Sequence, residues 1–231
     1  MPNKNTITRA NAAVFEIPKG AFLWWRSDKG ITLNSGAVSA WEDVTGRGAI
    51  FSQGTAIKQP LYQENQLNGH PVITFDGSND FFKLNTLGFS QSLPMSKYAV
   101  IKLIAWGGYN RILNGGLANC LSMQIGTPKV VLANNGSYPT TSISLTVGTY
   151  FIVSMELGAS VCTLQRNQDS PVTMDNGGGA SEPGGTYMGI YTNEISFPGN
   201  FSIAELITFN RSLSVGDDEK VKNYLKNRYN L

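Results

Sequence analysis

Short apolar or alternating runs recur along most of the chain, separated by glycine, asparagine, proline and serine. In residues 150–157 every second side chain from Phe151 to Leu157 is apolar, while Ser154 and Glu156 fall on the opposite face. A period of two predicts a strand with one side in water. Residues 98–106 are apolar on nearly both faces, which predicts a central strand covered twice. Further strands are predicted at residues 21–26, 37–43, 71–75, 81–84, 120–125, 129–133, 142–145, 160–166, 186–191 and 201–209.

A helical pattern is confined to the last part of the chain, where we predict one helix at residues 215–229. Ser214 can cap its first turn, which is acidic, and basic residues follow toward its end, as the helix dipole favours. The apolar stripe is expected to pack on the sheets. It consists of Val221, Tyr224, Leu225 and the stem of Arg228.

Many short strands with frequent turn residues predict an all-β fold, a two-sheet antiparallel β-sandwich of the jelly-roll kind with one C-terminal α-helix. The length of 231 residues suits one such domain, which we place at residues 21–231. Residues 1–20 have mixed polarity and no clear period, so we interpret them as an N-terminal arm. The glycine-rich residues 175–185 are expected to form a long mobile loop.

Charge and targeting signals narrow the possible partners. The formal net charge of +2 contains no run of like charges, so neither nucleic acid nor a membrane is expected as a partner. The N-terminus lacks the apolar core of a secretory signal, and we therefore expect synthesis in the cytoplasm. Cys120 and Cys162 both lie in apolar contexts, and buried free thiols are favoured over a disulfide.

The only histidine, His70, lies beside two aspartates in the stretch NGHPVITFDGSNDFF, residues 68–82, which raises the question of a catalytic or metal site. Asn68 and Gly69 suit a tight turn, and Asp76 suits a second turn in which its carboxylate accepts backbone N–H bonds. These properties favour architecture over catalysis, with His70 half exposed and inert.

Three segments carry a resemblance to a known family: LWWRSDKGITLNSGAVSAWEDVTGRG, QPLYQENQLNGHPVITFDGSNDFF and IAELITFNRSLSVGDDEKVKNYLKNRY. In this order they resemble the concanavalin A-like lectin/glucanase superfamily, in particular its laminin-G-like branch, over residues 22–231. The resemblance implies a concanavalin A-like sandwich in which the N-G-x-P-x-x-x-F-D-G-x-x-D stretch is a structural element. In the same way, Trp41 is expected in the core and Asp43 is expected to hold the following turn.

The resemblance also implies a possible calcium site at the sandwich rim, because laminin-G-like domains sometimes use an aspartate there. Asp76, Asn79 and Asp80 are the candidates in this chain, although D-x-[DN]-x-[DN]-G is absent and the three lie too close together to form a cage alone. No other cofactor is expected.

Catalytic patterns are missing from the sequence. Glycoside hydrolases of this fold carry an E-x-D-x-E strand, whereas Glu156 and Glu205 stand alone in their strand-like segments. No G-x-S-x-G occurs, and a serine triad would have to use His70. We therefore expect a protein that is not an enzyme, and a glycoside hydrolase is the least favoured alternative.

Binding of carbohydrate needs exposed aromatic and amide side chains on loops, because sugars stack on rings and bond to polar groups. The first candidates flank a glycine pair, Gly107 and Gly108, that interrupts a strand, and a second set lies in two later loops. The alternative for Trp106 and Tyr109 is that they cap the hydrophobic core. The candidate ligand-binding residues are Trp106, Tyr109, Asn110 and Arg111, then Asn134, Asn135 and Tyr138, and finally Tyr191 and Asn193.

The leading functional hypothesis is a non-catalytic recognition or display module of a bacteriophage virion, as a tail, fibre or capsid-decoration protein. Phage domains similar to this one use an N-terminal arm to dock to the particle, which implies virion proteins as partners of residues 1–20. A cell-surface glycan and a homo-oligomer are further possible partners. The alternative is a free carbohydrate-binding, lectin-like module.

Overall fold

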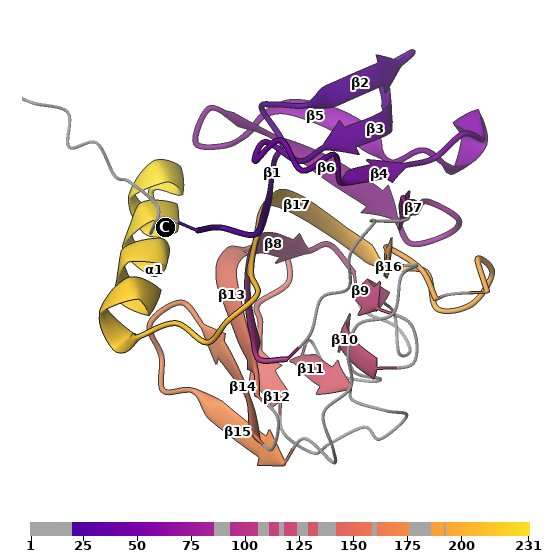
Figure 1. The fold of residues 1–231 in the computed structure, drawn as a ribbon. Helices are drawn as coiled ribbons and strands as arrows, with labels where there is room; N and C mark the ends of the chain where they lie inside the picture. Colours follow the sequence, from indigo (N-terminus) through magenta and orange to yellow (C-terminus); the bar gives the residue numbers. More distant parts are fainter. Residues whose placement is uncertain are drawn as a thin grey trace, which may run out of the picture.

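The computed structural model of the chain describes residues 20–85, 93–105, 111–115, 118–123, 129–133, 142–158, 161–175, 186–191 and 193–231. Strands dominate these residues, and every strand pairing is antiparallel (Figure 1). The strands are β1 (Leu23–Arg26), β2 (Ile31–Asn34), β3 (Ala37–Glu42), β4 (Ile50–Ser52), β5 (Leu61–Leu67), β6 (His70–Asp76), β7 (Phe82–Leu84), β8 (Met95–Leu103), β9 (Arg111–Gly115), β10 (Ala118–Met123), β11 (Lys129–Ala133), β12 (Ser142–Ser144), β13 (Tyr150–Leu157), β14 (Val161–Arg166), β15 (Val172–Asp175), β16 (Thr186–Met188) and β17 (Asn200–Phe209). A 3₁₀ turn, η1, spans Ala56–Lys58, and the helix α1 spans Val215–Tyr229.

The strands form two layers, which confirms the predicted β-sandwich. One layer has the order β15–β14–β13–β8–β17, and β17 then pairs with β1 along one half and with β6 along the other. The second layer has the order β2–β3–β4–β7–β16–β9–β10–β11–β12. Strand β5 joins the layers at one side, because it pairs with β6 and also with β3.

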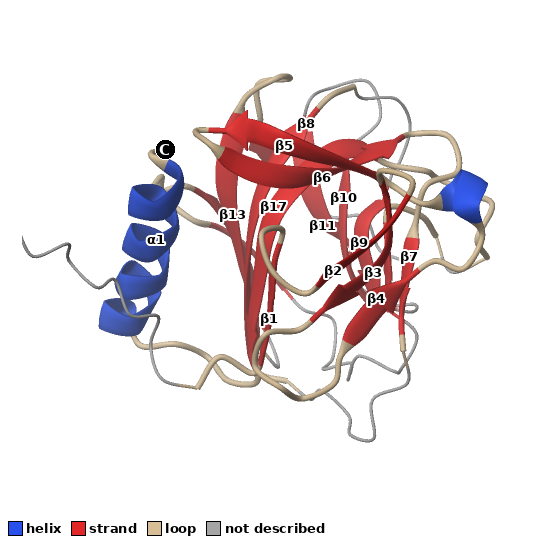
Figure 2. Cartoon of the chain, turned by 90° about the horizontal axis from the view of Figure 1, so that it is seen from above, coloured by secondary structure: helices blue, strands red, loops and turns tan. Residues whose placement is uncertain are grey.

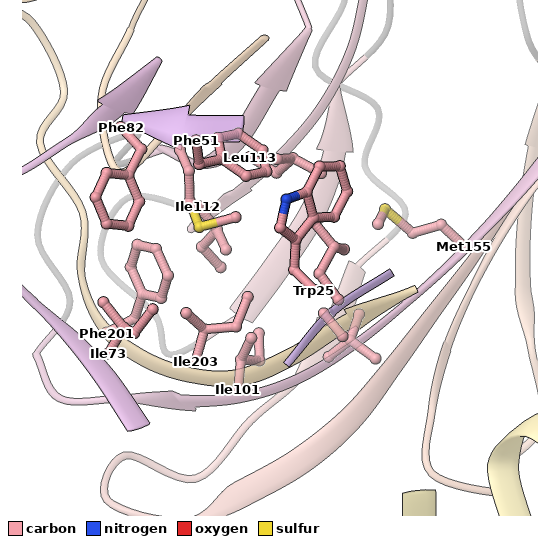
Figure 3. Packing of buried hydrophobic residues seen from close by; sticks show 14 of the residues in the cluster. Trp25, Phe51, Ile73, Phe82, Ile101, Ile112, Leu113, Met155, Phe201 and Ile203 are labelled. Carbon is pink, nitrogen blue, oxygen red and sulfur yellow. The ribbon is translucent and has the colours of Figure 1, made fainter. Parts of the chain in front are cut away.

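The main core lies between the layers, where large rings from both sheets meet (Figure 3). Trp25 and Phe51 pack at 4.8 Å between ring centroids, and Phe75 stacks on Phe201 at 4.6 Å. Trp41 is fully buried in the same cluster, as expected from its position in the sequence. Burial of a side chain of this size stabilises the fold by about 2–3 kcal/mol.

A second core lies between the outer face of the first layer and helix α1 (Figure 2). Val221, Tyr224 and Leu225 form the predicted apolar stripe, and all three are buried there with Tyr229. Ser214 caps the helix, as predicted, by accepting a hydrogen bond from Asp217 N at 3.2 Å. Asn230 ends the helix in the left-handed conformation, with a φ of 51°.

One face of strand β13 is less exposed to solvent than the sequence predicted. Phe151, Val153, Met155 and Leu157 face the inner core as predicted, but the opposite face is not wet along its length. Ile152 belongs to the cluster under α1, and Ser154 is buried. Because a sequence pattern does not show which sheet face a distant helix covers, the prediction assigned that face to water.

Several strands were missed by sequence reasoning, namely β2, β4, β5, β9 and β15. Strand β5 shows the reason, since most of its residues are partly or fully exposed and its sequence, LYQENQL, is largely polar. Its pairing depends instead on the two-residue turn at Asn68 and Gly69, whose φ values are 48° and 86°.

Cys162 is free and buried, as expected, and burial raises the pKa of its thiol to about 11. Among the described residues, no helix is long and apolar enough to cross a bilayer. The arm predicted at residues 1–20 lies outside the described residues except for Gly20, and the loop predicted at 175–185 lies outside them except for Asp175.

Candidate functional site

A loop that carries the exposed ring of Phe197 and the partly buried ring of Tyr191 connects β16 to β17, and we call its described residues, 189–191 and 193–199, the β16–β17 loop. It projects from the end of the sandwich away from helix α1, on the right in Figure 1. Two backbone hydrogen bonds close its base, from Gly199 N to Gly189 O at 2.7 Å and from Gly189 N to Ile112 O at 3.0 Å.

Glycine is required at the base of this loop. Gly189 has a φ of 90°, and a Cβ atom there would lie 2.4 Å from the ring of Phe75. At Gly199 a Cβ atom would lie 2.3 Å from the carbonyl oxygen of Arg111. The loop therefore sits tightly against the core and β9, which fixes the position of the residues that it carries.

Asn193 builds the tip of the loop. Its Oδ1 accepts hydrogen bonds from Ile195 N at 3.1 Å and Ser196 N at 2.9 Å, and its Nδ2 donates to Ser196 Oγ at 2.8 Å. An asparagine used in this way stabilises a turn. The structure thus places this candidate ligand-binding residue in the loop, with its amide engaged internally.

Arg111 and Tyr191, two further candidates, are brought together by the same loop. The Arg111 guanidinium lies 5.3 Å from the ring centroid of Tyr191 and 5.7 Å from that of Phe197, and the two rings pack edge to face at 5.9 Å. Arg111 opens strand β9 and is buried, whereas the sequence suggested an exposed loop residue. Contact of the planar guanidinium with the two rings offsets part of the free-energy cost of burying its charge.

Phe197 is 41% exposed, and both it and Glu194 have a φ of 59°. Bulky residues seldom adopt this left-handed conformation, and such strain concentrates at binding sites. The combination of strain and exposure distinguishes these two residues from the rest of the loop.

A pocket of about 340 Å³ lies beside the loop, between β4, β7 and Glu194. Its floor includes Phe81, whose ring packs against Tyr187 at 6.2 Å. The Lys83 ammonium lies 5.3 Å above the ring of Tyr187. The pocket is lined by Ser52, Gln53, Gly54, Phe81, Lys83, Leu84, Asn85 and Glu194.

Lys83, Tyr187 and Glu194 form a linked group at this pocket. Glu194 Oε1 accepts a hydrogen bond from the Tyr187 hydroxyl at 3.1 Å and lies 3.6 Å from Lys83 Nζ. Contact with the Tyr187 hydroxyl, followed by the nearby Glu194, raises the pKa of Lys83, so its ammonium stays charged at neutral pH. The pocket and the β16–β17 loop, with Phe81, Lys83, Arg111 and Tyr187, constitute the end-loop site.

The aspartates proposed for calcium lie next to this site and build a turn. Asp76 Oδ1 accepts hydrogen bonds from the backbone N–H groups of Ser78, Asn79 and Asp80, at 2.8, 3.2 and 3.3 Å. Asp80 Oδ2 accepts from Asp76 N at 3.0 Å, and burial together with the Asp76 charge raises the pKa of Asp80 to about 6. Within the described ranges, no three His, Cys, Asp or Glu side chains are grouped as metal ligands.

His70 lies at the opposite end of strand β6 from this turn. Its Nε2 is 3.0 Å from the Arg228 carbonyl oxygen at the end of helix α1, and burial lowers its pKa. Its contacts are therefore with the helix, not with Asp76 or Asp80, and they match the architectural interpretation.

Glu205, in strand β17, is fully buried and contacts Tyr229 of helix α1. Its carboxylate accepts hydrogen bonds from Trp24 Nε1 and from the Tyr229 hydroxyl, both at 2.6 Å, and Arg228 Nε lies 3.2 Å away. Burial raises its pKa despite these partners. We call Glu205, Trp24, Arg228 and Tyr229 the helix lock.

Five candidates from the sequence, Trp106, Tyr109, Asn110, Asn135 and Tyr138, lie outside the described residues, as does Asn134. The sequence reasoning in turn missed Phe81, Lys83, Tyr187, Glu194 and Phe197. A signal was present in IYTNEISFPGN, where an aromatic residue and a carboxylate stand in a short segment rich in turn formers.

No protein-family model matches the chain, and no curated protein sequence matches it. Among solved structures, the chain is similar to the ligand-binding domain of botulinum neurotoxin serotype D in complex with N-acetylneuraminic acid, with a TM-score of 0.64 and 16% identity over 89% of this chain and 51% of that one. It is also similar to the binding domain of Paraclostridial Mosquitocidal Protein 1, with a TM-score of 0.66, 12% identity and coverage of 92% and 54%.

A third similar structure is a Trypanosoma rangeli sialidase in complex with sialic acid, with a TM-score of 0.62, 13% identity and coverage of 92% and 34%. The chain thus spans about half the length of the two binding domains and a third of the sialidase. At these identities the likeness is one of fold, and the chain shares the β-sandwich of these proteins.

Proposed function

We propose that this chain is a non-catalytic carbohydrate-recognition module of the concanavalin A-like kind that binds saccharides at the end-loop site. The observation that carries the proposal is the 340 Å³ pocket lined by the Phe81 ring, Lys83 and Glu194, with the Tyr187 hydroxyl bonded to Glu194 beside it. Sugar sites need this combination, because the apolar face of a sugar stacks on a ring while its hydroxyls need fixed polar partners.

Each part of the site has a defined role in this proposal. The exposed ring of Phe197 offers a stacking surface, and Arg111 and Tyr191 hold that ring in place from behind. Lys83 donates and Glu194 accepts hydrogen bonds at the pocket mouth. Because the loop is fixed at its base by Gly189 and Gly199, little ordering is needed on binding.

Two of the similar structures support this function because each is a complex with a sugar. One is a toxin domain in complex with N-acetylneuraminic acid, and the other is a sialidase in complex with sialic acid. Their lengths exceed that of this chain, so the sugar specificity proposed here rests on the residues of the end-loop site.

A glycan array with the purified chain tests the proposal. We expect the wild-type protein to bind a defined set of glycans, and Phe197→Ala to lower the affinity about tenfold through loss of the stacking surface. Val215→Ala is the control, because Val215 is 77% exposed at the start of helix α1. Equal binding by Phe197→Ala and Val215→Ala would remove the end-loop site from the proposal.

The candidate residues within 106–110, which lie outside the described residues, carry a second prediction. Trp106→Ala combined with Tyr109→Ala is expected to abolish glycan binding while the melting temperature stays nearly unchanged. If the double variant unfolds instead, the rings belong to the core and take no part in recognition.

The module is proposed to be non-catalytic because the buried carboxylate of strand β17 and the carboxylate of the β16–β17 loop both have other roles. Glu205 is enclosed in the helix lock, and Glu194 is a single carboxylate paired with Lys83. A glycosidase needs two carboxyl groups across the scissile bond. Incubation with fluorogenic glycosides, including a sialoside, is expected to release no product above the buffer control.

Display on a bacteriophage-type particle is the finer part of the proposal, with residues 1–20 as the docking arm. Its support is the resemblance of the chain to domains of phage particles and the packing of Ala21, next to the arm, against the cluster under α1. Helix α1 lies at the opposite side of the molecule from the β16–β17 loop (Figure 1). Light scattering of the chain, with and without residues 1–20, mixed with particles that lack it, measures attachment. Attachment independent of the arm, or none, contradicts this part.

A further inference from the structure

We propose that the saccharide taken by the end-loop site is acidic, and that the Glu194 side chain occupies the position of the ligand's anionic group until the ligand displaces it. This inference rests on the proposed carbohydrate recognition and specifies its substrate class. Carboxylate-bearing sugars are the chemical class that matches the contacts described below.

The contacts of Glu194 are those that a bound carboxylate would make. One oxygen, Oε1, receives the Tyr187 hydroxyl at 3.1 Å and faces Lys83 Nζ at 3.6 Å. A phenol and an ammonium that converge on one oxygen form a charge-assisted pair of donors for an anionic acceptor. The two donors come from paired strands, since Tyr187 in β16 is opposite Lys83 in β7, so the donor pair is fixed by the sheet.

The carboxylate, in contrast, comes from a loop and is held loosely. The side chains of Glu194 and Lys83 remain 39% and 53% exposed, and a separation of 3.6 Å is longer than a close ion pair. Glu194 also has a left-handed backbone with a φ of 59°, a conformation that non-glycine residues seldom adopt. A ligand that replaces this contact therefore displaces a weak one.

The surroundings favour an anion over a cation. The Lys58 ammonium lies 5.5 Å from the ring centroid of Phe81, which lines the pocket together with Lys83, so a second positive charge lies beside the pocket. The aspartates of the adjacent turn face their own backbone N–H groups. A neutral sugar would leave Lys83 paired with Glu194, whereas the carboxylate of an acidic sugar would accept hydrogen bonds from both Lys83 and Tyr187.

The test compares matched acidic and neutral glycans, such as oligogalacturonate and its methyl ester, and sialyllactose and lactose, on an array and by calorimetry with the full chain. Wild-type protein is expected to prefer the acidic member of at least one pair. Glu194→Gln removes the competing charge and is expected to raise affinity for that member about two- to fivefold.

Lys83→Met removes the ammonium but keeps the length of the side chain, and it is expected to lower the affinity for the acidic member about tenfold. Lys220→Met is the control, since Lys220 is exposed on helix α1 at the other end of the protein. Melting curves check that each variant is folded.

Three outcomes separate the inference from the proposed function. A preference for acidic glycans, with affinity raised by Glu194→Gln and lowered by Lys83→Met, supports both the acidic-ligand inference and carbohydrate recognition. Binding of neutral glycans alone, or an acidic preference that neither variant alters, overturns the acidic-ligand inference and leaves carbohydrate recognition standing. Binding of no glycan by any protein overturns both.

Discussion

At the scale of single residues, two glutamates differ in what their carboxylates do. Glu205 is enclosed with Trp24, Tyr229 and Arg228, so its charge stabilises the packing of one element on another. Glu194 is exposed on a strained loop, so its charge is available to a ligand. The sequence analysis noted Glu205 as an isolated acidic residue and did not single out Glu194, because the role of each carboxylate depends on its partners in the folded protein.

Glu205→Ala is expected to lower the free energy of unfolding by about 3–5 kcal/mol, because Arg228 would lose a buried partner. Urea denaturation followed by tryptophan fluorescence measures the change. Glu64→Ala, at an exposed position on strand β5, is the control and should change stability little. A loss of under 1 kcal/mol for Glu205→Ala would mean that the helix lock contributes specificity without stability.

Asp80 makes stability depend on pH in a defined direction. Its pKa is raised to about 6 in the folded protein by burial and by Asp76, above the ordinary value of 3.8. The folded state therefore holds the proton more tightly, and the free energy of unfolding falls as pH rises from about 4 to 6. Asp80→Asn should remove this decline, which amounts to about 1–2 kcal/mol after solvent screening.

Urea unfolding of wild type and Asp80→Asn at pH 4.5 and pH 7 provides the measurement for this expectation. Asn retains an oxygen that can accept the Asp76 N–H bond, so the turn should persist. A pH slope that is the same in both proteins would show that Asp80 does not titrate in this range.

Single residues were predictable where their role is local. Asp43 holds its turn as expected, by accepting hydrogen bonds from Thr45 Oγ1 and Arg47 N, and Asp76 does the same in its own turn. Arg111 was misplaced because its burial depends on Tyr191 and Phe197, two rings that fold back from some 80 positions later in the sequence. The hydrogen bonds of a turn can be predicted from neighbouring residues, whereas cation–π contacts between residues distant in the sequence cannot.

At the scale of elements, the predictions were best for helix α1 and weakest for the edge strands. The bounds Val215–Tyr229 agree with the sequence because a capping serine, acidic first turn and apolar stripe all coincide. Strand β5 was missed because it buries few apolar residues, and its pairing depends on the turn at Asn68 and Gly69. Elements that combine several local signals are predictable, and those stabilised by pairing alone are not.

Leu225→Ala tests how firmly helix α1 is attached. Leu225 is fully buried between the helix and the sheet, so we expect a loss of about 2–5 kcal/mol in the free energy of unfolding. Ser214→Ala should cost only about 1 kcal/mol through loss of the cap. Calorimetry on both variants gives the comparison, and a larger loss for Ser214→Ala would contradict the assigned packing.

At the scale of the whole molecule, the two cores and the end-loop site divide the protein into a structural end and a binding end. Helix α1 and the core beneath it lie at one side, and the β16–β17 loop lies at the other (Figure 1). The sandwich was predictable from strand period and turn spacing. The site was not, because Phe81, Lys83, Tyr187 and Glu194 meet only after β7 and β16 have paired.

This separation predicts that stability and binding can be varied independently. Leu225→Ala should lower the melting temperature while its glycan affinity stays within twofold of wild type at a temperature where both are folded. Combined with Phe197→Ala, the two effects should add. A Leu225→Ala protein that is folded but no longer binds would show that the helix and the end-loop site are coupled.

Strand β17 connects the two ends, and its pairing determines how the protein would bear mechanical tension. Leu23, at the start of β1, pairs with Thr208 near the last residue of β17, whereas the β16–β17 loop enters that strand at Asn200. A tether at Gly20 and a load on the loop would thus pull the two strands along their length in opposite directions. Their hydrogen bonds run perpendicular to that pull, so they would share the force and fail together instead of one after another.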